Sequence, residues 1–122
     1  MTAAYLYLNS ALYALFAVWC TLASQSTARN LGYETLSASG RSEYLVIYGG
    51  LQLGLAAAFY LFARNPQTIQ LGLIFALCLY VPIVLYRIVT IARFWPVAGL
   101  TLGVAALEIA LLIAGLFLLY RR

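Results

Sequence analysis

Hydrophobic and polar positions along this chain are gathered in long blocks, without the short alternation typical of a soluble protein. Four blocks are almost entirely apolar, and the polar residues lie between them. A helix that crosses a hydrocarbon core of about 30 Å needs about 20 mainly apolar residues, and each block is that long. The pattern predicts an all-α fold, an integral membrane four-helix bundle forming one domain over 1–122, with helices at 3–23, 44–63, 67–92 and 97–120.

The connecting segments predict how the helices follow one another. A polar segment at 24–43 separates the first two helices, whereas the turn signals at 64–66 and 93–96 are short and contain proline. Such short turns make consecutive helices antiparallel neighbours, so we expect an up-down-up-down order. The first block lacks a positively charged start and is long for a signal peptide, so we expect it to be retained as a span.

Composition narrows the class of protein further. Apolar residues make up 66% of the chain and charged residues 8%, whereas soluble domains carry about a quarter charged residues. There is no histidine, and the three acids, Glu34, Glu43 and Glu108, are far apart in the sequence. We therefore expect no metal, no cofactor, no catalytic residues and no enzyme activity. Cys20 and Cys78 lie in apolar runs and are interpreted as small packing residues.

The net charge of +4 comes from arginines near the ends of the apolar blocks. This distribution indicates contact with anionic lipid headgroups and excludes a nucleic-acid partner. We expect a multi-pass protein of the cell inner (plasma) membrane. Each side carries three arginines, but two of them directly follow the last helix, which favours both termini in the cytoplasm. The two sets are Arg64, Arg121 and Arg122 on one side and Arg29, Arg41 and Arg93 on the other.

Two charged residues, Arg87 and Glu108, interrupt the apolar blocks themselves. A charge near the bilayer centre costs roughly 2.5–3.5 kcal/mol on insertion scales, so such residues usually face a partner or a cavity. Counted from the side of the first and third loops, Tyr48 lies ~6 Å deep, Arg87 ~8 Å, Gln52 ~12 Å and Glu108 ~17 Å. Side chains lean towards the start of their own helix, so Arg87 and Glu108 lean towards each other.

These depths predict a ligand-binding layer made of Tyr48, Gln52, Arg87 and Glu108 in a dry part of the bundle. Arg87 and Glu108 are expected to meet directly or through one water. The alternative interpretation is a structural ion pair that fixes the helix register, since breaking a buried pair costs roughly 3–5 kcal/mol. Asn9 lies in the opposite half of the membrane, as does its neighbour Ser10, and both are left out of the layer.

Two further features could help such a layer to form. Gly50 and Gly54 make a G-x-x-x-G step that allows the backbone of a neighbouring helix to approach closely. Pro82 removes one backbone hydrogen bond and frees the carbonyl of Cys78.

The segments Arg41-Ser42-Glu43-Tyr44 and Tyr48-Gly49-Gly50-Leu51-Gln52-Leu53-Gly54 resemble the motif of a family of small bacterial four-helix membrane proteins of unknown function, broadly DoxX-like. Arg87 and Glu108 match charged positions of the same pattern. This resemblance covers nearly the whole chain and implies a fold but no established activity. A fainter similarity, resting on Gly50-Leu51-Gln52, is to the four-helix scaffold protein that gathers sterol-biosynthesis enzymes at the endoplasmic reticulum.

Three functions follow from these observations. The first is the binding of a lipid-like or small amphiphilic ligand by the polar layer. The second is a scaffold or accessory subunit, acting as a homo-oligomer or recruiting a partner membrane protein. The third is a small proton-coupled transporter, similar in size to small multidrug exporters. Those exporters place an essential glutamate in helix one, whereas the first block here has no charge.

Overall fold

The fold is given by a computed structural model that describes residues 1–121, and all its regular elements in that range are helical. In chain order they are α1 (Thr2–Leu22), α2 (Ser24–Asn30), α3 (Ala38–Leu45), the π-helix η1 (Val46–Leu51), α4 (Gln52–Arg64), α5 (Ile69–Arg93) and α6 (Gly99–Tyr120). Four helices are long and apolar enough to cross a membrane, with α3, η1 and α4 counted as one continuous helix. The predicted all-α class is confirmed, and the four long helices indicate a multi-pass membrane protein.

The second long helix begins earlier than the sequence predicted. It runs over Ala38–Arg64, whereas its apolar block begins at position 44. Ser37 caps its start, because its hydroxyl oxygen accepts a hydrogen bond from the backbone N–H of Gly40 at 3.1 Å. The helix is therefore longer than its apolar block, and its first turns extend into the polar segment.

The polar segment at 24–43 is largely helical and folds back onto the end of α1. Arg41 Nε donates a hydrogen bond to the Ser24 hydroxyl at 3.1 Å, and the Tyr44 hydroxyl donates to Thr27 Oγ1 at 2.9 Å. Ser24 and Thr27 are both buried by these contacts. This part of the chain forms a small cap whose polar groups bond to one another, with Cys20 as a packing residue beneath it.

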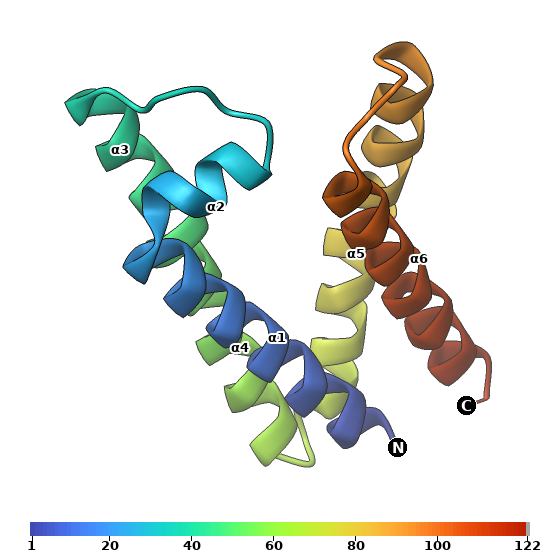
Figure 1. The fold of residues 1–122 in the computed structure, drawn as a ribbon. Coiled ribbons are helices and arrows are strands. Elements are labelled where there is room, and N and C mark those ends of the chain that lie inside the picture. The colour runs from blue at the N-terminus through green and yellow to red at the C-terminus, as the bar shows by residue number, and fades with distance from the viewer. Residues whose placement is uncertain (122) are drawn as a thin grey trace.

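The long helices pack as two close pairs. α1 lies along α4, α5 lies along α6, and contacts between the two pairs are fewer. Figure 1 shows that the pairs cross near one end of the molecule and diverge towards the other, so that the bundle has the outline of a V. The described part of the chain begins and ends at the end where the pairs cross (Figure 1). Arg122, which entered the prediction of topology, lies outside the described residues.

The end where the pairs cross, here called the closed end, holds the main core. Its buried residues come from all four long helices and are Tyr5, Leu6, Phe59, Ala63, Leu73, Ala76, Tyr80 and Leu111. Close approach requires glycine at Gly72, where an added Cβ would lie 2.6 Å from Phe62 Cβ and 2.8 Å from Leu6 Cδ1. The backbone of α5 at Gly72 is thus packed directly against side chains of α4 and α1.

The expected role of Gly50 and Gly54 is wrong within this chain. A Cβ added to either residue would meet no atom within 4 Å, so neither glycine packs against a neighbouring helix. The adjacent Gly49 has that role instead, because a Cβ there would lie 2.8 Å from Thr21 Oγ1 of α1. The π-helix η1, which contains both Gly49 and Gly50, lies at this contact. Its turn is wider than that of an α-helix, so the regular α-helical spacing assumed from the sequence does not hold here.

Candidate functional site

Arg87 on α5 and Glu108 on α6 form a two-point ion pair. Arg87 Nε donates to Glu108 Oε2 at 2.8 Å, and Arg87 Nη2 donates to Glu108 Oε1 at 2.8 Å. Parallel bonds of this kind are the strongest arrangement of guanidinium and carboxylate and fix the orientation of both groups. The short turn between α5 and α6 makes the two helices neighbours, and the two side chains meet directly, as their lean towards each other had indicated.

The pair does not lie in a sealed, dry interior, which corrects the sequence-based expectation. The Arg87 side chain is 30% exposed and that of Glu108 is 15% exposed. The physical reason is the divergence of the two helix pairs, which leaves space beside the carboxylate where a closed bundle would place a fourth helix. Arg87 and Glu108 are therefore part of the wall of an open space.

That space is a cavity of about 1080 Å³ between the α1/α4 pair and the α5/α6 pair. All four residues of the predicted layer, Tyr48, Gln52, Arg87 and Glu108, line it. The volume slightly exceeds the range of about 300–1,000 Å³ that is usual for sites of small molecules. Most of the remaining lining residues are leucines and aromatic residues. The site thus combines a few convergent polar groups with a largely apolar wall.

Tyr48 is positioned by its aromatic neighbours. Its ring stacks on Tyr44, with centroids 4.5 Å apart, and meets Tyr33 and Phe16 edge-on. The hydroxyl groups of Tyr33 and Tyr48 are 3.2 Å apart and share a hydrogen bond. Tyr48 lies within η1, and π-helical turns often occur at functional sites.

Gln52 follows directly after η1 and is weakly held. Its Nε2 donates to the carbonyl of Ile47 at 3.4 Å, which is longer than the usual 2.7–3.2 Å. Within residues 1–121, its side-chain oxygen bonds to no protein group by the same criteria. Gln52 therefore keeps both an acceptor and donor capacity for a bound molecule.

Five aromatic residues of the cavity wall escaped the sequence analysis. They are Tyr13, Phe16 and Trp19 of α1, Tyr33 of the cap and Tyr80 of α5. In an apolar helix such residues have the same pattern as core or interfacial residues, so periodicity alone could not identify them. The informative signal was their number on one helix, since α1 also contains Tyr5 and Tyr7.

The deep end of the cavity is closed by hydrogen bonds between protein groups. The Tyr80 hydroxyl donates to Asn9 Oδ1, and Asn9 Nδ2 donates to the carbonyl of Tyr5 at 2.8 Å. Asn9 is fully buried and does not line the cavity, nor does Ser10, whose hydroxyl donates to the carbonyl of Ala56 at 2.8 Å. Both residues bond to protein groups at the crossing of the helices.

Cys78 differs from the expectation of a packing residue, since it is exposed on α5. Within residues 1–121, no three His, Cys, Asp or Glu side chains gather in a way that could hold a metal ion. The groups that do converge on the cavity can donate and accept hydrogen bonds and can pack against a ring or a hydrocarbon chain.

No protein-family model, curated protein or solved structure matches this chain. The DoxX-like resemblance accordingly stays a prediction based on the motifs at 41–44 and 48–54. The likeness to the sterol-pathway scaffold stays a prediction too.

Proposed function

We propose that this protein is a membrane protein that binds a lipid-like or small amphiphilic molecule in the cavity between its two helix pairs. The observation that carries the proposal is the convergence of Tyr48, Gln52, Arg87 and Glu108 on one cavity of about 1080 Å³. Polar groups inside a membrane protein usually mark a ligand site when they face a cavity. The apolar remainder of the wall suits the hydrocarbon part of the same ligand.

The polar part of the ligand would meet the ion pair and its neighbours. Arg87 engages Glu108 through Nε and Nη2, and within the described residues its Nη1 donates to no protein group. That nitrogen and the free oxygen of Gln52 offer a donor and an acceptor on opposite walls. Arg87 is therefore assigned to a carbonyl or another accepting group of the ligand, and Tyr48 and Gln52 to its orientation.

The proposed setting is the inner membrane, crossed four times in alternating directions, with both termini in the cytoplasm. Support comes from the arginines that flank the spans. Arg121 directly follows α6, where the positive-inside effect is strongest. Fusion of a periplasm-sensitive reporter to the C-terminus tests this orientation, and reporter activity in the periplasm would overturn it.

The binding proposal is tested by measuring ligand-induced thermal shifts and bound mass for a panel of lipids and quinones. The compared proteins are wild type, Glu108→Gln and the matched control Thr90→Val. Thr90 lies one turn beyond Arg87 on α5, and its hydroxyl bonds only to carbonyls of its own helix. We expect at least one compound to stabilise wild type and the control but not Glu108→Gln. Equal binding of every compound to all three proteins would overturn the proposal.

One observation favours a second function, that of an accessory subunit for a partner membrane protein. Gly50 and Gly54 are exposed, and no atom lies within 4 Å of an added Cβ at either position. Such a face can admit the helix of another protein closely. Gly50→Leu should then abolish retention of a second protein during purification in mild detergent. A clean monomer from the wild type would contradict this function.

A further inference from the structure

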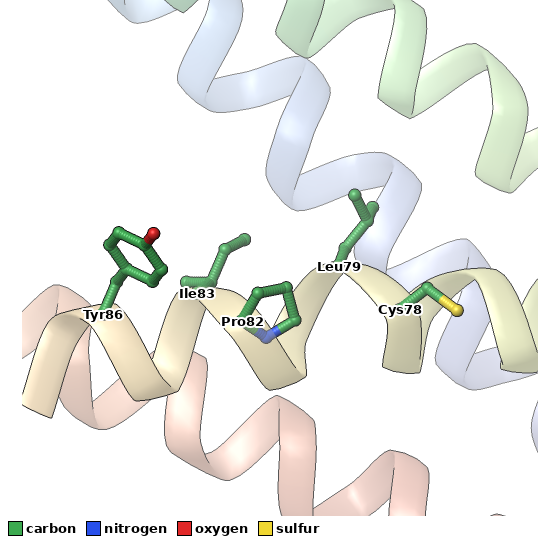
Figure 2. Close-up of a pocket in the computed structure, with 5 residues that line it drawn as sticks. All are labelled: Cys78, Leu79, Pro82, Ile83 and Tyr86. Carbon is green, nitrogen blue, oxygen red and sulfur yellow. The ribbon is translucent and has the colours of Figure 1, made fainter.

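A second hollow, of about 310 Å³, lies on the surface of α5 around Pro82. Figure 2 shows its five lining residues on α5, with the proline ring between the longer side chains of Leu79 and Ile83. The other two are Cys78 and Tyr86. The side chains of Cys78 and Pro82 are smaller than those of the other three lining residues, so they leave a depression in the helix surface.

The hollow and the large cavity share two residues. Leu79 and Ile83 line both spaces, so they form the wall that separates the cavity from the outer surface of α5. Both are only half-buried. Elsewhere on the same helix, Leu73 and Ala76 are fully buried in the core. At Pro82 the cavity and the hollow therefore share the side chains of Leu79 and Ile83 as their common boundary.

The position of this barrier relative to the ion pair matters. Ile83 lies one turn before Arg87, and Leu79 lies two turns before it, ~12 Å along the helix axis. A polar headgroup at Arg87 would thus have apolar wall directly below it, and the hollow lies beside that wall. All the lining residues of the hollow are apolar or weakly polar, and they lie on α5, one of the helices long and apolar enough to cross a membrane.

The charge of the site restricts the headgroup. Arg87 and Glu108 neutralise each other through two hydrogen bonds, and within residues 1–121 no other charged side chain lines the cavity. An uncharged headgroup needs no counter-charge from the protein, whereas an anionic or cationic headgroup would compete with one partner of the pair.

We propose that the hollow at Pro82 is a lateral opening, and that the ligand is an uncharged amphiphile with one long hydrocarbon chain. Its headgroup lies at Arg87, Gln52 and Tyr48, and its chain leaves the cavity between Leu79 and Ile83 towards the bilayer. This inference rests on the proposed binding function and adds the class of ligand and its path.

The test compares two glycerol esters with the same headgroup, monobutyrin and monopalmitin. Binding is measured by native mass spectrometry of protein released from nanodiscs. Ile83→Trp places a large ring in the opening, and Leu85→Trp is the matched control on the same helix, where the native side chain is 59% exposed and lines neither space. Loss of contact for about two methylene groups corresponds to an affinity about tenfold lower. We therefore expect monopalmitin to bind Ile83→Trp about tenfold more weakly than it binds wild type or Leu85→Trp.

Monobutyrin serves as the control for folding and for the headgroup site. Its chain is too short to reach the opening, so it should bind all three proteins equally. Equal binding of monopalmitin to all three proteins would overturn the lateral opening while leaving the binding function intact. Loss of both esters from Ile83→Trp would also overturn it, because the substitution would then act on the headgroup site. If neither ester binds wild type, the assigned class of ligand is wrong. The binding function itself is then decided separately by the Glu108→Gln comparison across the wider panel.

Discussion

Polar groups have opposite roles at the closed end of the molecule and at the end beside the cap, where the helix pairs diverge. This second end is here called the open end. At the closed end, Asn9 is fully buried and bonds to Tyr80 and to the backbone of Tyr5. At the open end, Arg87 and Glu108 bond to each other but remain partly exposed to the cavity. Polar groups in lipid must find partners, and at the closed end Asn9 finds its partners within the protein. The open end keeps unused hydrogen-bonding capacity, which the proposed ligand would use. The contrast separates polar residues that stabilise the fold from polar residues that face the cavity.

The largest effect on stability is expected at the closed end from Phe59→Ala. Phe59 is fully buried, stacks on Tyr13 with centroids 5.6 Å apart and meets Phe75 edge-on. Removal of its ring should lower the free energy of unfolding by about 3 kcal/mol, since a packing defect forms among four helices. Titration with denaturing detergent measures this change in the free energy of unfolding. Leu61→Ala, at a position 57% exposed on the same helix, should cause little change, and equal losses in both variants would contradict a core at this end.

The ion pair allows a sharper test of the open end. Glu108→Gln should lower the free energy of unfolding by about 1–2 kcal/mol, less than for a fully buried pair because both side chains are partly exposed. The double substitution Arg87→Glu with Glu108→Arg restores opposite charges across α5 and α6. It should recover most of the stability but not ligand binding, since the donor and the acceptor have exchanged helices. If the exchanged pair binds ligand as wild type does, the pair has only a structural role.

Asn9→Leu tests the closed end by removing hydrogen bonds without opening a large space. The hydroxyl of Tyr80 would lose its acceptor in a buried position, which costs about 1–2 kcal/mol. Binding at the cavity should be unchanged, because Asn9 does not line it. Thermal unfolding and ligand titration on the same sample measure both quantities. A large loss of ligand binding with little loss of stability would contradict the assignment of Asn9 to the fold rather than to the binding site.

The smallest effect is expected from Tyr33→Phe. Its hydroxyl bonds to that of Tyr48 at an exposed site, so the loss of stability should be about 0.5 kcal/mol. Tyr44→Phe provides the comparison, because that hydroxyl is buried and donates to Thr27 at 2.9 Å. Detergent unfolding should rank Tyr44→Phe as the more damaging change. The opposite order would show that the cap is not held together by the Tyr44 contact.

Much of the fold could be predicted from the blocks of apolar residues. Three of the four long helices begin and end within two residues of the predicted limits. The close packing of α1 along α4 could not be predicted, because a long polar segment joins these helices and imposes no geometry. The early start at Ala38 was missed for a related reason. Arg41, Ser42 and Glu43 are polar, and hydrophobicity reports contact with lipid rather than helical conformation.

The candidate site was predictable where charge made it conspicuous. Arg87 and Glu108 stand out in apolar blocks, and counting residues along the helices placed Tyr48 and Gln52 near them. The cavity itself was not predictable, since it depends on the angle between two helix pairs, which the sequence pattern does not encode. Tyr33 was missed for this reason. It lines the cavity only because the cap folds back over the end of α1.

The ion pair also bears on how the chain enters the membrane during synthesis. Arg87 and Glu108 lie on consecutive spans joined by a turn of a few residues, and each alone would add roughly 2.5–3.5 kcal/mol to the insertion of its helix. When both spans leave the translocon together as a hairpin, the carboxylate and the guanidinium neutralise each other before either meets hydrocarbon. We therefore expect α5 and α6 to partition into lipid as one unit, and a ribosome-bound chain ending before α6 to hold α5 near the aqueous pore.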